Sequence, residues 1–303
     1  MELKTIGLTK KFGSKTAVNA LNITLTNGVY GLLGANGAGK TTLMRLLCNI
    51  QTPTSGKILL NGRNIVELGE KYRNLLGYLP QHFGYYPDFS AYDFLIYVSA
   101  LKGLDEKAAR KKSKELLEAV DLSRESKHKI KTFSGGMKQR LGIAIALVGK
   151  PDFILLDEPI NGLDPEGIIE IRELILKLNK ENGITFLISS HYLDELSKIA
   201  TCYGFMDRGR IVKEISKKEL EMNLKRRTQL KVNNIKECVK YLEETKIPYK
   251  IISDEIIDIY EKVNVTEIVS ALSKRNCIVN DFQEKGETLE SYYLNLIGGA
   301  DND

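Results

Sequence analysis

The chain has 303 residues, of which 43% are hydrophobic and 27% charged, a composition typical of a soluble globular protein with one large domain or two smaller ones. No apolar run approaches the ~20 residues that cross a bilayer, and the first residues lack the apolar segment of a signal peptide. Lys and Arg outnumber Asp and Glu by 32 to 24 over the first 219 residues, whereas the remainder has 12 against 15. This balance is too weak for a nucleic-acid-binding surface, so we expect no nucleic-acid partner.

The N-terminal part of the chain has the pattern of an α/β domain. Segments 3–13 and 56–65 predict antiparallel strands of a small β subdomain. Apolar runs at 27–34, 152–158 and 183–190 are bounded by Gly, Asn or Pro and followed by helical patterns, which predicts buried and largely parallel strands. We expect this domain to cover residues 1–218.

After about residue 218 the pattern changes. Residues 228–285 predict a β-α-β-β-α-β succession, the ferredoxin-like order, and residues 288–299 predict a short helix. We therefore expect a small C-terminal α+β domain over residues 219–303. The four cysteines, Cys48, Cys202, Cys238 and Cys277, are far apart in sequence and indicate buried free thiols in a reducing compartment.

The segment GANGAGKTT fits the phosphate-loop pattern G-x-x-x-x-G-K-[ST]. It follows an apolar strand and opens a helical pattern, a context that favours nucleotide binding over a glycine-rich turn without a ligand. Glycines let successive N–H groups face the phosphates, and the helix N-terminus adds a favourable dipole. The candidate nucleotide-binding residues are Gly34, Ala35, Asn36, Gly37, Ala38, Gly39, Lys40, Thr41 and Thr42. Among them, Lys40 is the candidate for the outer phosphates and the Thr41 hydroxyl for Mg²⁺.

Two carboxylates, Asp157 and Glu158, end the buried strand FILLDE. Ligands of open α/β sheets bind at the carboxyl ends of the strands, so these acids are expected to face the phosphate loop. Asp157 is the candidate for holding Mg²⁺ through water, and Glu158 for activating the attacking water as a general base. The alternative is that both acids only cap the following segment.

Four further residues are candidates for the nucleotide site, although none of them alone would indicate one. Gln81 follows a predicted strand and could contact Mg²⁺ or the attacking water, or lie in a surface loop. His191 follows the buried strand ITFLISS and could hydrogen-bond a γ-phosphate, or simply start a helix. Asp164 precedes Pro165, as a helix N-cap does. Phe12 could stack on an adenine face.

A second anion-binding turn lies at Ser134, Gly135 and Gly136, within the stretch TFSGGMKQR. Ser-Gly-Gly at a helix start presents several backbone N–H groups, which suits an anion. One phosphate loop is already present about a hundred residues earlier, so this second turn needs a separate explanation.

The order of these motifs resembles the ATP-binding subunit of the ABC transporter family, across roughly residues 1–215. GANGAGKTT matches the Walker A loop, Gln81 the Q-loop, FSGGMKQ the signature, FILLDE Walker B, NGLD the D-loop with Asp164, and His191 the switch. Phe133 and Met137 replace the usual Leu and Gln of the signature, and Asn161 replaces the usual Ser of the D-loop. The resemblance implies a P-loop NTPase fold with a mixed sheet core, an antiparallel β subdomain and an α-helical subdomain, and an ATPase that uses ATP and Mg²⁺.

The resemblance also implies a pair of identical subunits, head to tail, with each ATP held between the Walker A loop of one and the signature of the other. A separate membrane permease is implied, which would place the chain at the cytoplasmic face of the membrane. Of the chain's 9 Phe and 14 Tyr, seven lie within residues 82–103, which favours this segment as the permease contact over a purely internal aromatic core.

The aromatic segment, the FSGGM variant and the acidic C-terminal part are similar to ATPases of bacitracin-type and lantibiotic-immunity exporters. An exporter of another cargo, such as an ion or a lipid, stays open as an alternative. A non-transport ABC ATPase is disfavoured, because those acting on ribosomes generally carry two nucleotide cassettes and those acting on DNA have long coiled coils. This chain has a single phosphate loop and no sustained heptads.

Overall fold

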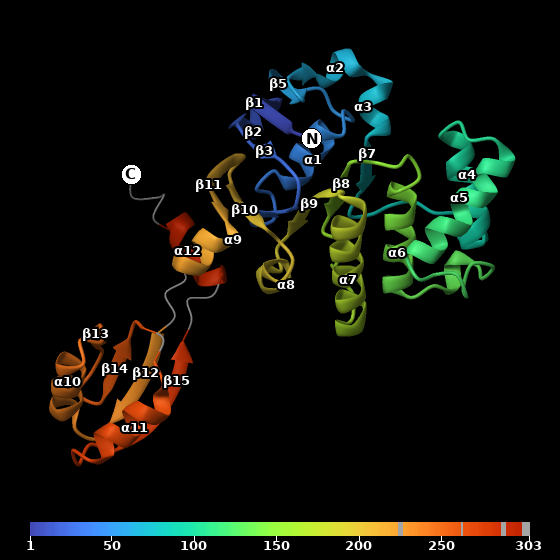
Figure 1. Ribbon diagram of the computed structural model, residues 1–303. Coiled ribbons are helices and arrows are strands. Elements are labelled where there is room, and N and C mark those ends of the chain that lie inside the picture. The colour runs from blue at the N-terminus through green and yellow to red at the C-terminus, as the bar shows by residue number, and fades with distance from the viewer. Residues whose placement is uncertain (224–226, 262, 286–288, 299–303) are drawn as a thin grey trace. The chain divides into compact units, whose positions relative to one another are not determined.

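The computed structural model describes residues 1–223, 227–261, 263–285 and 289–298. The chain divides into two compact units, Met1–Lys217 and Lys218–Asp303 (Figure 1). Within the described ranges, no helix combines the length and the apolar character needed to span a bilayer.

The centre of the first unit is a six-stranded sheet in the order β11-β10-β4-β9-β8-β7. Its neighbours pair in parallel from β10 to β7, and only the edge strand β11 is antiparallel to β10. The strands are β4 (Val29–Leu33), β7 (Leu76–Leu79), β8 (Phe153–Asp157), β9 (Thr185–Ser190), β10 (Cys202–Asp207) and β11 (Arg210–Ser216). Every residue of β4, β8 and β9 is buried, which agrees with their apolar sequences and confirms the predicted parallel core.

A smaller antiparallel sheet contains the N-terminal strands, as the sequence predicts. It consists of β1 (Leu3–Phe12), β2 (Lys15–Leu21), β3 (Thr24–Leu25), β5 (Ser55–Leu60) and β6 (Arg63–Asn64). Helix α1 (Lys40–Leu47) buries Leu43 and Leu47 in a cluster that contains Leu8 and Ile58 of this sheet and Leu155 of β8. One hydrophobic core therefore supports both sheets and the helix that follows the phosphate loop.

The helical part of the first unit is also as predicted. Its main helices are α4 (Ala91–Leu101), α5 (Glu106–Ala119), α6 (Gly135–Ala146) and α7 (Pro165–Asn182), with shorter helices α2 (Ile65–Leu68), α3 (Glu70–Asn74) and α8 (Leu193–Ser197) and a 3-10 turn, Ile130–Thr132. Helices α4, α5 and α6 contact one another, and α6 lies beside α7 (Figure 1). Ser90, Asp105, Ser134 and Asp164 each cap one of the main helices by accepting a backbone N–H bond.

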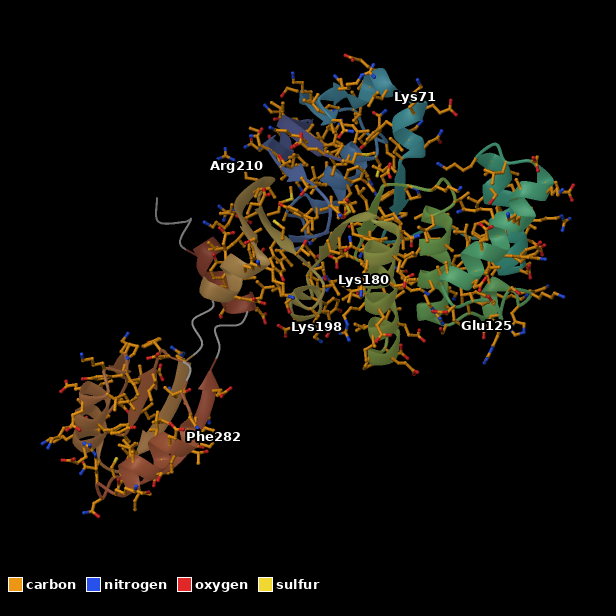
Figure 2. The ribbon with its side chains drawn as sticks, viewed as in Figure 1. Lys71, Glu125, Lys180, Lys198, Arg210 and Phe282 are labelled. Atoms are coloured by element: carbon orange, nitrogen blue, oxygen red, sulfur yellow. The ribbon has the colours of Figure 1, made fainter. Side chains whose placement is uncertain are left out.

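The second unit contains the predicted β-α-β-β-α-β succession. Its elements are β12 (Arg227–Val232), α10 (Ile235–Glu244), β13 (Tyr249–Ile251), β14 (Ile256–Ile259), α11 (Val265–Ser273) and β15 (Val279–Lys285), and all neighbouring strands pair antiparallel in the order β13-β14-β12-β15. The edge strand β15 leaves Phe282 52% exposed (Figure 2), although its cross-strand neighbour Leu230 is buried.

Two helices complete the second unit at its ends. Helix α9 (Lys217–Asn223) starts at the last residue of the first unit and continues into the second. Helix α12 (Leu289–Gly298) falls within the predicted helix 288–299, whose two end residues lie outside the described ranges. Cys48, Cys238 and Cys277 are buried, but Cys202 on β10 is half-buried, so the expectation of burial is wrong for that cysteine.

Candidate nucleotide-binding site

The phosphate loop joins the end of β4 to the start of α1, as its sequence predicts. At Gly39, the residue before α1, φ is +110°, and a Cβ atom there would lie 2.3 Å from the carbonyl oxygen of Ala17 on β2. A Cβ at Gly34 would lie 2.5 Å from the carbonyl oxygen of Met206 on β10. Glycine is therefore required at both ends of the loop because neighbouring backbone approaches too closely for any side chain.

Replacing Gly39 with Ala is expected to destabilise the protein and impair ATP binding. Backbone strain alone costs about 1–3 kcal/mol, and the clash with Ala17 displaces either β2 or the loop. Gly62 is a matched control, because its φ is +80° but no atom lies within 4 Å of an added Cβ. Denaturant unfolding should show a larger decrease in the free energy of unfolding for Gly39→Ala than for Gly62→Ala. Equal decreases in the two variants would contradict the close approach of β2 to the loop.

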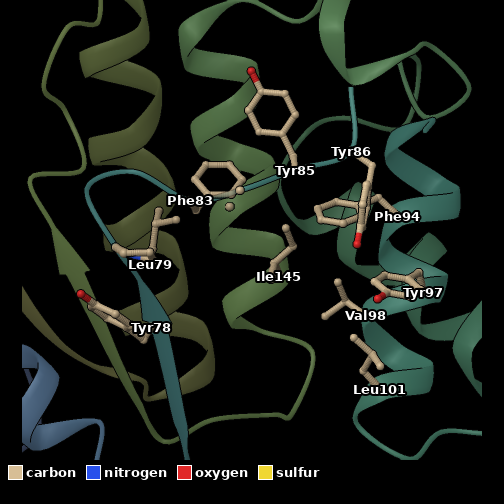
Figure 3. Close-up of a pocket in the computed structure, with 13 residues that line it drawn as sticks. Tyr78, Leu79, Phe83, Tyr85, Tyr86, Phe94, Tyr97, Val98, Leu101 and Ile145 are labelled. Carbon is tan, nitrogen blue, oxygen red and sulfur yellow. The ribbon is translucent and has the colours of Figure 1, made fainter. Parts of the chain in front are cut away.

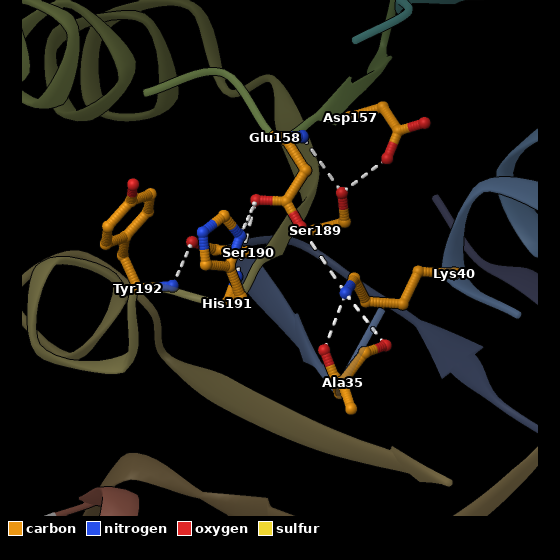
Figure 4. Close-up of polar contacts among 9 residues, drawn as sticks. Ala35, Lys40, Asp157, Glu158, Ser189, Ser190, His191 and Tyr192 are labelled. Carbon is orange, nitrogen blue, oxygen red and sulfur yellow. Dashed lines mark hydrogen bonds and ion pairs between the residues drawn. The ribbon is translucent and has the colours of Figure 1, made fainter. Parts of the chain in front are cut away.

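Lys40 is 6% exposed and reaches across the loop (Figure 4). Its ammonium Nζ donates to the carbonyl oxygen of Gly34 at 2.6 Å and to that of Ala35 at 3.4 Å. The same ammonium lies 3.3 Å from Oε1 of Glu158. The structure thus brings the predicted phosphate lysine and the predicted general base into direct contact.

Glu158 is held from both sides. Its second oxygen, Oε2, lies 2.8 Å from His191 Nδ1 and accepts the His191 backbone N–H at 3.3 Å. The residue is 7% exposed and has a left-handed backbone, with φ of +52°. A non-glycine residue in that conformation costs free energy, which surrounding contacts must hold in place. The Lys40–Glu158–His191 chain supplies such contacts.

Asp157 is connected to Glu158 through Ser189 of the neighbouring strand β9. The Ser189 hydroxyl donates to Asp157 Oδ1 at 2.6 Å and accepts the Glu158 N–H at 2.9 Å. Within the described residues, the other oxygen, Asp157 Oδ2, is buried without a hydrogen-bond partner. A buried carboxylate oxygen left in this way is costly unless a ligand or water satisfies it.

A cavity of about 260 Å³ lies between Glu158 and the phosphate loop. Gln81, which follows β7, lines it together with loop residues and Glu158, while β2 contributes Lys15 and Ala17. Behind the site, burial and then the Asp157 carboxylate raise the pKa of the Cys48 thiol, which keeps it protonated and unreactive.

Other predicted residues lie elsewhere among the described part of the chain. Phe12 is 47% exposed and is absent from the cavity lining. Asp164 caps α7, because its Oδ1 accepts the Gly167 N–H at 3.1 Å. Ser134 caps α6 by accepting the Met137 N–H at 3.2 Å, and Ser134 and Gly135 are exposed outside the cavity, while Gly136 is buried. The signature therefore does not contribute to the cavity of its own chain.

Sequence reasoning missed Ser189 and Lys15. The signal for Ser189 was present, since two hydroxyl residues directly precede His191 in an otherwise apolar strand. Lys15 carried no such signal, because its position depends on the packing of β2 against the loop.

Comparison with known proteins agrees with this geometry. A family model described as ABC transporter matches residues 18–161. The chain is 38% identical to the bacitracin transport ATP-binding protein BcrA of Enterococcus faecalis, over 98% of this chain and 97% of the relative. It is 41% identical to the lantibiotic transport ATP-binding protein SrtF of Streptococcus pyogenes, over 70% of this chain and 90% of the relative.

Among solved structures, the fold matches a dimeric ATP-binding cassette in a post-hydrolysis state bound to ADP and Pi. The TM-score is 0.63 at 25% identity, over 71% of this chain and 98% of the solved chain. Both the fold and the near full-length relatives lead to the same assignment. The chain belongs to the ABC transporter family, as one of its ATP-binding proteins.

Proposed function

We propose that this chain hydrolyses ATP to power export of an antimicrobial peptide or drug through a separate membrane permease. Residues 1–218 are the nucleotide-binding domain in this proposal, and residues 219–303 an accessory domain. The observation that carries it is the contact of Lys40 with Glu158 at the carboxyl ends of β4 and β8, in a chain similar to a bacitracin transport ATPase over nearly the whole length of both. The loop 34–42 then holds the phosphates, and the exposed Phe12 ring, over which the Lys10 ammonium lies 5.1 Å from the ring centroid, stacks on adenine.

The residues of the site fit a Mg²⁺ ion. Asp157 Oδ2 lacks a hydrogen-bond partner within the described residues, and carboxylate and hydroxyl oxygens are the ligands that Mg²⁺ prefers. Asp157, the Thr41 hydroxyl and Gln81 would hold the ion, directly or through water. Mg²⁺ supplies neutralisation of the charge that develops on the phosphate oxygens.

Hydrolysis requires Glu158 to change partners. When ATP binds, Lys40 exchanges Glu158 Oε1 for the outer phosphates, because a polyphosphate attracts the ammonium more strongly than one carboxylate does. The freed oxygen then accepts a proton from the attacking water, while Nδ1–H of His191 holds Oε2. Donation from the same ring to the γ-phosphate uses Nε2–H and therefore requires the doubly protonated imidazolium. The pairing of Glu158 with Lys40 therefore keeps the base occupied until nucleotide arrives.

Two copies of the chain complete each other's sites in this proposal. Ser134, Gly135 and Gly136 contact the phosphates bound by the partner subunit's loop, with Asp164 close to the same interface. The exposure of Ser134 and Gly135 supports this arrangement, as does the dimeric state of the solved cassette with ADP and Pi.

An aromatic groove supports the proposed permease contact at residues 82–103 (Figure 3). A cavity of about 530 Å³ is lined by Leu79, Phe83, Tyr86 and Ile145, among others. Phe94 is buried and belongs to the core of the helical part, but Tyr86 is 51% and Leu101 70% exposed. An apolar groove with exposed aromatic residues suits docking of a helix from a membrane partner, which would place the chain at the cytoplasmic face of the membrane.

Bacitracin is expected to raise the ATPase rate of the chain purified together with its membrane partner. The measurement is phosphate release in Mg²⁺ and ATP, with bacitracin or a lantibiotic added. Leu101→Glu is the control, because it adds a charge at the end of the groove and leaves the nucleotide site intact. This variant should bind ATP normally, but bacitracin should no longer raise its ATPase rate. Stimulation by neither peptide would contradict the proposed cargo class and favour an ion or lipid.

A further inference from the structure

Lys15 is the first residue of β2 and lies on the wall of the nucleotide cavity. It stands directly opposite Phe12 in the β1–β2 hairpin, so both side chains emerge on the same face of the ribbon. Two residues further along β2, the carbonyl of Ala17 packs against Gly39 of the phosphate loop. The hairpin thus joins the predicted adenine-stacking ring to the loop, and Lys15 lies beside that ring and two residues from the contact with the loop.

The charges lining the cavity leave Lys15 as its uncompensated cation. The charged lining residues are Lys15, Lys40 and Glu158. Lys40 and Glu158 form an ion pair at 3.3 Å, whereas no ion pair or hydrogen bond joins the Lys15 ammonium to any part of the chain that the structure describes. The cavity therefore has one surplus positive charge, which lies on β2 and suits a polyanionic ligand.

We propose that Lys15 is a phosphate-binding residue of this site, contacting the inner phosphates of the nucleotide. The inference rests on the proposed function, in which the cavity binds ATP. Lys40 and Glu158 mark the outer end of the phosphate chain, because the general base must reach the water that attacks the last phosphate. Lys15 belongs to the hairpin that carries Phe12, at the adenine end, so its ammonium meets the phosphates nearest the nucleoside.

The test compares Lys15→Met with Lys11→Met. Lys11 is an exposed lysine of the same hairpin, but it pairs with Thr16, one position along, so it faces the opposite side and does not line the cavity. Both changes remove one positive charge and keep most of the side-chain stem. Equilibrium binding of ATP and of ADP to the full chain in Mg²⁺ measures the effect, and circular dichroism checks folding.

Lys15→Met is expected to weaken ATP and ADP binding by the same factor, about threefold to tenfold, as for a charge-assisted contact open to solvent. Lys11→Met should leave both affinities unchanged, and Lys15→Arg should restore them. The dependence of affinity on salt should also become shallower in Lys15→Met.

The proposal would be overturned if Lys15→Met bound both nucleotides with wild-type affinity. It would also be overturned if Lys15→Met and Lys11→Met lost nucleotide affinity by the same factor. A loss confined to ATP would overturn the assignment to the inner phosphates. Failure of the folded wild-type chain to bind either nucleotide would instead overturn the proposed function, so the two failures are distinguishable.

Discussion

Glu158→Gln is expected to leave ATP bound while nearly abolishing its hydrolysis. Removing a positioned general base lowers the rate by about 10²–10⁴-fold. The amide has the shape of the carboxylate and can still accept the His191 backbone N–H. The contacts that hold the strained backbone of this residue, with φ of +52°, are therefore largely kept, and the fold should not change. The amide also no longer attracts Lys40, which leaves that ammonium available to phosphate.

Two measurements check this expectation. Phosphate release gives the rate. Light scattering after size-exclusion chromatography in ATP should show a persistent dimer, because in the proposed head-to-tail pair the ATP between the two subunits is not consumed. Glu166→Gln is the matched control, since Glu166 is an exposed acid in the first turn of α7, outside the cavity. Normal turnover in Glu158→Gln would exclude Glu158 as the base.

The features that could be predicted from sequence are those set by local rules. The buried strands β4, β8 and β9 are continuous apolar runs, and the phosphate loop is a fixed spacing of glycines before Lys40. The cap at Asp164 follows from residue type and its position before Pro165. Each such signal lies within a few residues of the feature that it specifies.

The contacts that could not be predicted join segments far apart in the chain. Ser189 contacts Asp157 because β8 and β9 pair with those two residues opposite each other. The register of two parallel strands cannot be predicted from the sequence of either strand alone. The Lys40–Glu158 pair needs β4 and β8 to place their ends together, with β9 between them. Lys15 reaches the cavity only because Gly39 lets β2 approach the loop.

Ser134→Arg is expected to abolish hydrolysis while the isolated subunit binds ATP as tightly as before. Ser134 is exposed and lies outside the cavity that contains Lys40, so a bulky side chain there leaves the loop of its own chain untouched. In a head-to-tail pair the same side chain blocks the phosphates held by the partner. Loss of preorganised donors to a reacting phosphate costs about 10²–10³-fold in rate, and a steric block adds to that.

The control separates this block from loss of a helix cap, which costs about 1 kcal/mol. Ser90 caps α4 in the way that Ser134 caps α6, so Ser90→Arg removes an equivalent capping hydrogen bond in the same helical part. The Ser90→Arg protein should keep the basal ATPase rate of the wild type. Lys40→Ala provides the opposite comparison, because it removes the cation that faces the phosphates and should weaken ATP binding by the subunit itself. An equal loss of ATP affinity in Ser134→Arg and Lys40→Ala would place the signature in the pocket of its own chain.

Mixing the two inactive variants distinguishes a shared site from a private one. A mixed pair contains the intact loop of the Ser134→Arg chain facing the intact signature of the Lys40→Ala chain, which together make one complete site. Hydrolysis should therefore return when the two are combined, although neither hydrolyses ATP alone. If each chain contained its whole site, no pairing could restore activity, because both pockets would still lack a residue. The proposed shared arrangement gives the turn at residues 134–136 a phosphate loop to face, which it lacks in its own chain.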